Sequence, residues 1–248
     1  MSAHRVVRRA RPLLGTLVEV GATASACACL EEAIDAVDAA FERVAALQQR
    51  LSRFVASSAI GRFNAAPAST CVAIDCETRI VLAAAATLRD ATDDAFDVTL
   101  GSGARAWHVD ARGLHKLAKQ VQIDLGGIAK GYAVDCAVAT LEAHGIGGGW
   151  VNAGGDLRAF GSLAVPIDLR DEIEGGVRRF ATIEDGAFAT SRRDAAPGAL
   201  RHASVAAPRC LWADALTKVV VHTADPRHPL LARFGARAWL HARPVASG

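Results

Sequence analysis

Hydrophobic residues recur at steps of three and four between residues 30 and 51, and charged residues fill most of the remaining positions. The hydrophobic positions are Leu30, Ile34, Val37, Phe41, Val44, Leu47 and Leu51. This period predicts an amphipathic helix that buries one face. Helical spacing or a run of alanines predicts further helices over residues 77–91, 127–143 and 211–223.

Shorter segments in which apolar and polar residues alternate predict strands. These segments are residues 12–21, 72–74, 121–125, 149–153, 157–161, 165–170, 178–184, 186–191, 202–207 and 236–242. Residues 95–101 are predicted to be extended, residues 101–119 to be a loop region with room for a hairpin, and residues 192–201 to be a polar turn. Because strand follows strand after residue 148, the pattern favours an α+β fold, with mixed or antiparallel sheets packed against helices, over a doubly wound sheet.

Length and composition set the size of the core. The chain has 248 residues and is 51% hydrophobic, which is enough for one domain over residues 1–248 or for two interlocked halves. The formal net charge of +2 gives no reason to expect a nucleic acid partner. No apolar run reaches the roughly 18 residues of a membrane span, and no signal-peptide core follows the first arginines, so a cytoplasmic protein is expected. Arg5, Arg8, Arg9 and Arg11 favour a solvated tail before the first strand over a phosphate-binding arm.

The six cysteines are Cys27, Cys29, Cys71, Cys76, Cys136 and Cys210. They form no C-x-x-C pair that a pair of histidines at zinc-finger spacing could complete. We therefore expect reduced, mostly buried thiols rather than a zinc site.

Gly126 and Gly127 fall between a predicted strand and a predicted helix, in the sequence IDLGGIAKGYAVD over residues 123–135. Glycines at such a junction let the backbone approach a ligand closely, and a helix start with Lys130 one turn in attracts an anion. These features predict a cradle for a phosphate or pyrophosphate. A plain turn is the alternative interpretation.

Two later segments also carry candidate chemistry. Gly154 and Gly155, just before Asp156, indicate either a hairpin turn or a backbone surface for a planar ring or a phosphate. Asp214 lies at the start of the helix predicted over residues 211–223. It would serve there as an N-terminal cap or as a ligand of a divalent cation.

Together these segments resemble the FAD:protein FMN transferase (ApbE-type) family. The similar motifs are RPLLGT at residues 11–16, LSRF at residues 51–54 leading through Ser58 to Asn64, FDVTLG at residues 96–101, DLGGIAKGYAVD at residues 124–135, NAGGD at residues 152–156, ATS at residues 189–191 and ADAL at residues 213–216. They occur in the family's order and extend over nearly the whole chain.

The resemblance implies an ApbE-like (T-fold-like) architecture that binds FAD and Mg²⁺. Such a protein transfers FMN to a Ser or Thr hydroxyl of a target flavoprotein and releases AMP. The resemblance is also compatible with a homodimer. The cation would stabilise charge on the leaving pyrophosphate oxygens. The residues that the resemblance assigns to FAD are Gly15, Thr16, Phe96, Asp97, Thr99, Asp124, Gly126, Gly127, Lys130, Gly154, Gly155, Asp156, Thr190 and Ser191. The metal would be held by the Ala129 carbonyl, Asp214 and a hydroxyl, here that of Thr217.

The chain departs from the family pattern at the metal site. The family's metal-binding threonine lies four residues after the aspartate, where this chain has Lys218. Three arrangements are open: Thr217 substitutes for the threonine, the Lys218 ammonium takes the cation's place beside Asp214, or Lys218 and Asp214 form an ordinary surface pair.

The family's H-x-I-D-P-x-T-G segment is also missing, because residues 192–210 hold only His202. His202 is therefore either a remnant catalytic base or a plain strand histidine. His202 and Lys130 are the two candidate catalytic residues. Two further functions are open: a weakly active or inactive FAD-binding protein, and a Mg²⁺-dependent FAD pyrophosphatase that uses water in place of the hydroxyl.

Overall fold

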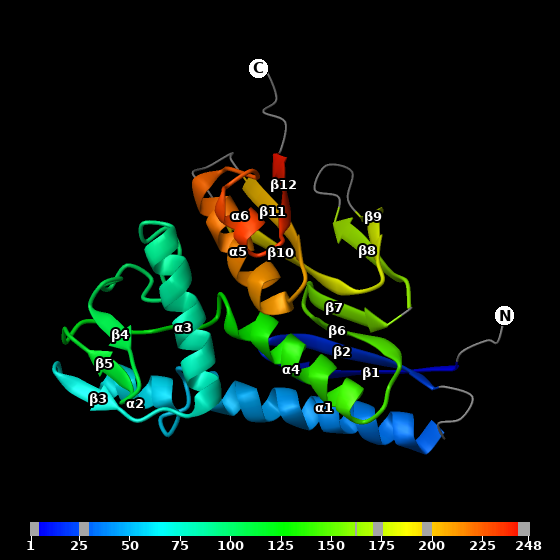
Figure 1. Ribbon diagram of the computed structural model, residues 1–248, viewed down its shortest axis with the longest axis horizontal. Helices are drawn as coiled ribbons and strands as arrows, with labels where there is room; N and C mark the ends of the chain where they lie inside the picture. Colours follow the sequence, from blue (N-terminus) through cyan, green and yellow to red (C-terminus); the bar gives the residue numbers. More distant parts are fainter. Residues whose placement is uncertain (1–4, 25–29, 162, 171–175, 195–199, 243–248) are drawn as a thin grey trace.

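A large antiparallel sheet forms the centre of the computed structural model, which describes residues 5–24, 30–161, 163–170, 176–194 and 200–242 (Figure 1). The strand order is β1-β2-β6-β7-β10-β11-β12. The strands are β1 Arg5–Leu13, β2 Thr16–Ala24, β6 Gly148–Ala153, β7 Asp156–Gly161, β10 Gly186–Asp194, β11 Leu200–Ala207 and β12 Arg237–Ala242. Helices and antiparallel sheets therefore coexist, and the predicted α+β class is confirmed.

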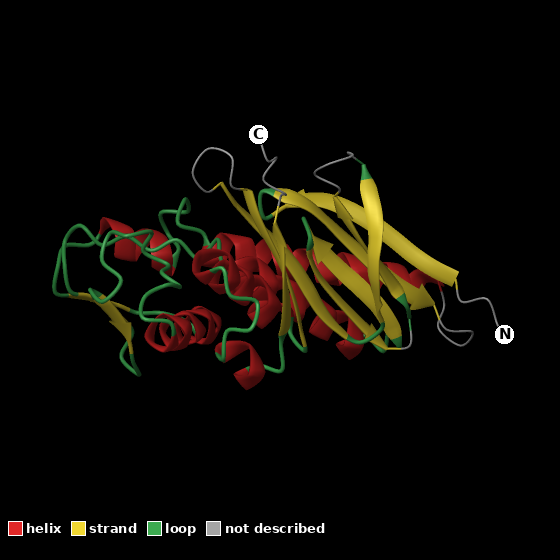
Figure 2. Ribbon diagram, turned by 90° about the horizontal axis from the view of Figure 1, so that it is seen from above, coloured by secondary structure: helices red, strands yellow, loops and turns green. Residues whose placement is uncertain are grey.

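Three helices, α1 Leu30–Leu51, α4 Ala129–Ala143 and α5 Cys210–Thr223, cover one face of this sheet (Figure 2). Helix α4 lies between α1 and α5 and contacts both. The predicted stripe of α1 is buried, as its period requires, with Val37, Phe41 and Val44 almost inaccessible. Helix α5 covers β10 and β11, so it faces the end of the sheet away from β1.

A hairpin of β8 (Val165–Arg170) and β9 (Val177–Ile183) covers part of the opposite face. Leu157 and Phe188 from the large sheet pack there with Val165 and Ile167. The small three-stranded sheet, in the order β3-β5-β4, lies at one end of the molecule. Its elements and neighbours are β3 Thr70–Val72, β4 Trp107–Val109, β5 Leu114–Lys116, α2 Ala59–Ala65 and α3 Cys76–Ala91, and the short α6 Leu230–Arg233 follows α5.

Three predictions about segments of the large sheet were wrong. Residues 12–21 are not one strand, because Leu14 and Gly15 adopt left-handed backbone angles and turn β1 into β2. The arginines that were assigned to a solvated tail lie within β1, where Arg9 donates to Asp38 of α1 at 2.8 Å. The polar turn was also placed too early, since β10 continues to residue 194; residues 195–199 lie outside the described residues.

The prediction of mostly buried cysteines was right only in part. Cys71 and Cys76 are exposed, so the expectation of mostly buried thiols fails for two of the four described cysteines. Cys27 and Cys29 lie outside the described residues.

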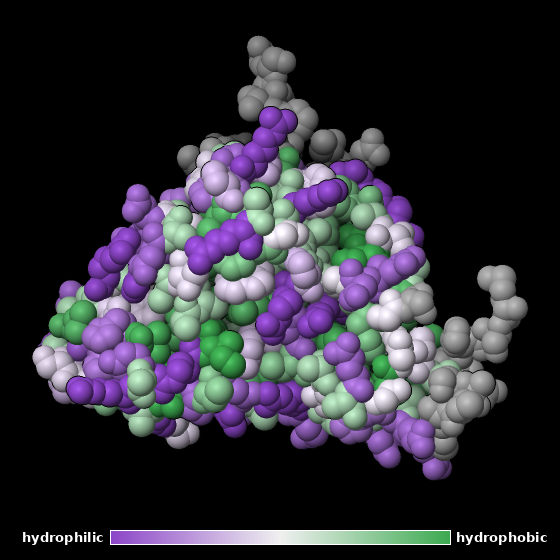
Figure 3. All heavy atoms as spheres, in the orientation of Figure 1, coloured by the Kyte–Doolittle hydropathy of each residue, from purple (hydrophilic) through white to green (hydrophobic). Residues whose placement is uncertain are grey.

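Hydrophobic and hydrophilic residues are interspersed over the face in Figure 3. Across the described ranges, every helix is too short or too polar to cross a membrane.

Candidate active site

The segment after α3 forms a loop that is closed by its own side chains. The Asp97 carboxylate accepts hydrogen bonds from the Thr99 amide at 2.7 Å, the Thr99 hydroxyl at 2.7 Å and the Gly101 amide at 2.9 Å. Thr99 is itself buried. Asp97 and Thr99 therefore fix the loop, which leaves its backbone and the neighbouring side chains to meet a ligand.

Residues 121–125 pair with no strand of the three described sheets, so the strand predicted there was wrong. The Asn64 side chain takes the place of a neighbouring strand: its amide donates to the Ile123 carbonyl at 2.9 Å and its oxygen accepts from the Ile123 amide at 2.7 Å. The Asp124 amide donates to the Val98 carbonyl at 2.8 Å. The 97–101 loop and the Gly126–Gly127 turn are thus held side by side.

The turn itself presents fewer free amides than the sequence suggested. The Gly126 amide donates to the Asp124 carboxylate at 2.8 Å, and the Ile128 and Ala129 amides both donate to the Leu125 carbonyl. An amide that already has an acceptor inside the protein gains little from a phosphate. The positive charge for an anion must come from side chains instead.

Helices α4 and α5 approach closely at Gly131. A Cβ at this position would lie 2.2 Å from the Cys210 carbonyl oxygen and 2.8 Å from Asp214 Cβ. The Gly131 amide donates to Asp214 Oδ2 at 3.0 Å. Asp135 strengthens the same contact, because its buried carboxylate accepts from the Cys210 and Leu211 amides and thereby caps α5.

Replacing Gly131 by alanine is expected to separate the two helices and to lower the free energy of unfolding by about 1–3 kcal/mol through overpacking. Thermal and urea unfolding measure the loss. Gly147→Ala is the matched control, because nothing lies within 4 Å of a Cβ there, and a change of less than about 0.5 kcal/mol is expected. Equal stabilities for the two variants would contradict the described contact.

Four alternating charges lie where α4, α5 and β7 meet. Lys218 Nζ contacts Asp214 Oδ1, Lys130 Nζ lies 3.5 Å from Asp214 Oδ2, and Lys130 donates to Asp156 Oδ2 at 2.5 Å. We call Lys218, Asp214, Lys130 and Asp156 the charge cluster. With both carboxylates and both ammonium groups ionised, its net charge is zero.

Burial and charge act against each other on these groups. Burial alone would raise the pKa of Asp214, but Lys218 and Lys130 outweigh burial and lower it. Burial, with the charge of Asp214 added, raises the pKa of Asp156 to about 6 despite Lys130. Burial would lower the pKa of Lys130, yet the charges of Asp214 and Asp156 raise it. Asp214 therefore stays ionised at neutral pH, whereas the pKa of Asp156 lies at about 6.

These residues do not fit the divalent cation that the sequence resemblance implied. The Asp214 carboxylate is fully buried and already has two ammonium groups and the Gly131 amide as partners. The Thr217 hydroxyl is buried and donates back to the Asp214 carbonyl at 2.6 Å. A metal at Ala129, Asp214 and Thr217 would have to displace both lysines. Of the three arrangements left open by the sequence, the geometry supports the one with Lys218 beside Asp214, and the burial of Asp214 excludes an ordinary surface pair.

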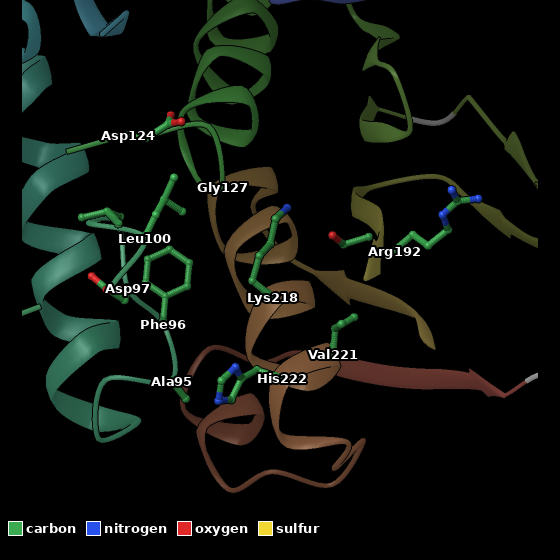
Figure 4. Close-up of a pocket in the computed structure, with 12 residues that line it drawn as sticks. Ala95, Phe96, Asp97, Leu100, Asp124, Gly127, Arg192, Lys218, Val221 and His222 are labelled. Atoms are coloured by element: carbon green, nitrogen blue, oxygen red, sulfur yellow. The ribbon is translucent and has the colours of Figure 1, made fainter. Parts of the chain in front are cut away.

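A cavity of about 310 Å³ opens next to this cluster. Its lining residues are Ala95, Phe96, Asp97, Val98, Leu100, Asp124, Gly127, Ser191, Arg192, Lys218, Val221 and His222. Figure 4 shows Lys218 running along α5 toward the Gly127 turn, with Phe96 on the facing loop. A Cβ at Gly127 would lie 3.8 Å from both Cγ and Cε of Lys218, so the turn and the lysine are in contact.

The cavity gathers some of the predicted FAD-binding residues and leaves others outside. Phe96, Asp97, Asp124, Gly127 and Ser191 line it, whereas Lys130 and Asp156 lie behind it in the charge cluster. Outside its lining are Gly15, Thr16, Thr99, Gly126, Gly154, Gly155 and Thr190.

Gly154 and Gly155 form the tight β6–β7 turn, as the simpler interpretation predicted, and both have positive φ. A Cβ at Gly154 would lie 2.3 Å from the Thr16 hydroxyl oxygen. The β1–β2 turn therefore packs directly on the β6–β7 turn, which places Gly15 and Thr16 beside Gly154 rather than beside the cavity.

His202 does not line the cavity, although its cross-strand partner Arg192 does. It pairs in register with Arg192 on β10 and His241 on β12. Alternation along β11 puts its side chain on the face of Ser204, whereas Ala203 and Val205 pack in the helix-covered core. Thr190 lies on the same face as His202, with its hydroxyl 3.0 Å from the Ser204 hydroxyl. The geometry does not support His202 as the catalytic base and favours the plain strand histidine.

Four residues of the cavity wall lie outside the motifs that sequence reasoning singled out: Ala95, Arg192, Val221 and His222. His222 lies four residues after Lys218, which itself lies four residues after Asp214. Residues at this spacing share one face of a helix. That period was a signal for His222 in the sequence, whereas only the packing of α5 against the 95–100 segment shows that the face borders a cavity.

Comparison with known proteins decides the family. The model of the ApbE family matches residues 14–196. The chain belongs to the ApbE family. The motif resemblance found in the sequence is thereby confirmed over most of the chain.

Individual members of the ApbE family show how far the similarity extends. The FAD:protein FMN transferase of Vibrio cholerae is 27% identical over 157 residues, which cover 52% of this chain and 47% of that protein. The FAD:protein FMN transferase of Rhodobacter capsulatus is 41% identical over 69 residues, which cover 27% of this chain and 13% of that protein. The matched part thus spans about half of the first relative and less of the second.

Solved ApbE structures share the whole fold. The ApbE protein of Thermotoga maritima superposes with a TM-score of 0.84 at 23% identity and covers 98% of this chain and 96% of its own. The flavinyl transferase ApbE of Pseudomonas stutzeri, in its apo form, has a TM-score of 0.80 at 22% identity and covers 98% and 94%. The expected ApbE-like architecture is confirmed.

Proposed function

We propose that the protein transfers FMN from FAD to a Ser or Thr hydroxyl of a target flavoprotein and releases AMP. One observation carries the proposal: the Lys218 ammonium lies at the wall of a cavity, in contact with the Gly127 turn and backed by Asp214. A fixed cation beside a glycine turn that lets a ligand approach the backbone suits a diphosphate. Two catalogued relatives that match part of the chain are FAD:protein FMN transferases, which supports the same chemistry.

The reaction is a substitution at phosphorus. The acceptor hydroxyl oxygen forms a bond to the FMN phosphorus, and the bond from that phosphorus to the bridging oxygen breaks. AMP leaves with the bridging oxygen, and the hydroxyl proton passes to a base. Charge grows on the phosphate oxygens in this step, so the enzyme gains most from cations placed beside them.

Lys218 supplies this cation in our proposal, with Lys130 adding positive potential from behind Asp214. Asp214 holds the Lys218 ammonium in place, since Lys218 also donates to the Asp214 carbonyl at 3.0 Å. The two ammonium groups occupy the surroundings of Asp214 that a magnesium ion would need, so no step of the proposed reaction passes through a metal at this site.

His222 is the imidazole of the cavity wall and is exposed to solvent. We assign it as the base that takes the proton from the acceptor hydroxyl, because it lies one turn beyond Lys218 on the same face of α5. Phe96 and Val221 form an apolar part of the cavity wall. Leu100 is 71% exposed and offers an apolar side chain to the edge of a flavin or adenine ring.

The test is incubation of the purified protein with FAD and a flavoprotein domain that bears an acceptor threonine. Covalent flavin fluorescence on that domain after denaturing electrophoresis, together with one AMP per flavin attached, is the expected result. A domain with the acceptor threonine changed to alanine is the control. Free FMN and AMP without labelling would make the protein a pyrophosphatase, and bound but unreacted FAD would make it a binding protein; either outcome overturns the proposal.

The affinity for FAD is expected to rise as pH falls through about 6, the pKa to which burial raises Asp156. Protonation of Asp156 changes the net charge of the charge cluster from zero to +1, while the FAD diphosphate keeps its charge in this range. The increase approaches tenfold per pH unit at most. Titration calorimetry between pH 5 and pH 7.5 measures it, in a His222→Gln background so that this imidazole does not contribute.

Asp156→Asn serves as the control, because it is expected to remove most of this pH dependence and to bind FAD at pH 7.5 as tightly as the unchanged protein does at pH 5. An unaltered pH profile in Asp156→Asn would contradict the assignment. The raised pKa also has a consequence for folding. Because the folded protein holds the proton more strongly, its stability falls as pH rises from 3.8, the ordinary value, to about 6.

A further inference from the structure

A second group of chemically reactive side chains lies on the three-stranded sheet, at the end of the molecule that carries β3, β5 and β4 (Figure 1). Cys71 on β3 pairs in register with His115 on β5, and His115 pairs in register with His108 on β4. Residues that are direct partners across neighbouring strands point to the same face of a sheet. The pairing therefore places one thiol and two imidazoles in a row across the sheet. In the chain, Cys71 lies 37 residues before His108, and His108 lies seven residues before His115.

The side chains of this row are in contact. The rings of His108 and His115 stack with centroids 4.2 Å apart and planes at 5°. His115 Nε2 lies 2.9 Å from Asp110 Oδ1 and 3.6 Å from Cys71 Sγ. One donor atom each from His108, Asp110 and His115 lies within 4.8 Å of the other two. None of these residues lines the cavity next to the charge cluster.

The turn between β4 and β5 fixes this geometry. The Arg112 and Gly113 amides donate to Asp110 Oδ1 at 2.8 and 3.1 Å, which holds the carboxylate at the turn. A Cβ at Gly113 would lie 2.4 Å from the Val72 carbonyl oxygen and 3.1 Å from Cys71 Sγ. Glycine at this position therefore keeps β3 and its thiol close to the turn.

We propose that His108, Asp110 and His115 bind a divalent transition-metal ion of the zinc class, with the Cys71 thiolate as a fourth ligand. Two imidazoles, a carboxylate and a thiolate are the nitrogen, oxygen and sulfur donors that such ions prefer. Metal–ligand bonds of about 2.0–2.3 Å place the ligand atoms of a tetrahedral site about 3.3–3.8 Å apart. The donor atoms of His108, Asp110 and His115 lie within 4.8 Å of one another, so a shortening of about 1 Å would bring these three to the spacing of such a site.

The ion would join all three strands of this sheet. Each strand has three residues, and strands this short gain little from their own ladder. A metal bound only in the folded state stabilises that state in proportion to its affinity and concentration. The site is a structural one in this proposal, and it is independent of the proposed flavin chemistry.

The experiment uses the full chain, without an affinity tag, reduced and freed of metal by a chelator that is then removed. Co²⁺ is titrated and followed by visible absorption, and Zn²⁺ is then added in competition. The expected result is one equivalent of Co²⁺ with the intense absorption of a four-coordinate site and a thiolate-to-cobalt charge-transfer band, displaced by Zn²⁺. Zn²⁺ is also expected to raise the melting temperature.

Variants localise the site. His108→Asn and His115→Asn are each expected to weaken Zn²⁺ binding at least tenfold, and Cys71→Ser to remove the charge-transfer band. His144→Asn and Cys76→Ser, which change an exposed histidine and an exposed cysteine elsewhere, are expected to leave binding unaltered. Absence of stoichiometric four-coordinate Co²⁺, or equal weakening by His144→Asn, would overturn the proposal. A charge-transfer band that survives in Cys71→Ser would overturn the assignment of the thiolate.

Discussion

Replacing Lys218 by methionine is expected to lower the rate of flavin transfer by a factor of about 10²–10³, the usual effect of removing one group that stabilises transition-state charge. Methionine keeps a long unbranched chain against Gly127 and removes only the ammonium. The dissociation constant for FAD is expected to rise about 10- to 100-fold, since a hydrogen bond to a charged group contributes roughly 1.5–3 kcal/mol. Steady-state transfer assays and calorimetry measure the two effects.

Two further lysine variants separate charge from bulk in this experiment. Lys218→Arg keeps the positive charge and is expected to retain part of the affinity for FAD. Lys119→Met removes an exposed ammonium outside the cavity lining and is expected to change neither quantity. A Lys218→Met variant that folds and transfers flavin at the unchanged rate would contradict the role given to the ammonium.

Replacing Asp135 by alanine is expected to lower the free energy of unfolding by about 3–5 kcal/mol, which is the typical cost of removing one partner of a buried ion pair. The carboxylate is almost inaccessible, accepts from Arg158 at 2.9 Å and caps α5 through the Cys210 and Leu211 amides. Its loss leaves these donors unsatisfied beneath the charge cluster. Urea denaturation measures the change, with an unaltered slope expected for a two-state transition.

Asp168→Ala is the matched control for this variant. Asp168 is exposed and pairs with exposed Arg179 at 2.7 Å, so its removal is expected to cost at most about 1 kcal/mol. Similar losses for Asp135→Ala and Asp168→Ala would show that Asp135 does not hold α4 and α5 together.

Periodicity predicted the elements whose burial repeats regularly. The stripe of α1 and the helices over 76–91, 129–143 and 210–223 follow from local spacing alone. The segment 121–125 alternates like a strand, but its backbone is satisfied by the Asn64 side chain, a contact between residues 59 apart in the chain. No local pattern can reveal such a partner. The same holds for the first strand, in which the charges of Arg9 and Arg11 are matched by Asp38 on α1.

Part of the candidate site could be predicted from the sequence, and part of it depends on contacts between distant segments. The motifs led to the Gly127 turn and to Asp214, and the structure brings both to one place through the Gly131 contact. The phosphate cradle stays a prediction, but the Gly126, Ile128 and Ala129 amides already have acceptors within the protein and contribute less to it than the sequence suggested. His202 was a candidate base by residue type alone, and its place outside the cavity lining agrees with the other interpretation, a plain strand histidine. His222 has the helical spacing of Asp214 and Lys218, yet the cavity beside it depends on packing between distant segments.

The affinity for FAD, measured by titration calorimetry once with excess EDTA and once with excess Mg²⁺, tests the role of the lysine ammonium most directly. Because Lys218 and Lys130 already neutralise Asp214, we expect the same dissociation constant under both conditions, with Lys218→Met weaker in each. Binding of FAD by the unchanged protein that requires Mg²⁺ and disappears in EDTA would contradict this account.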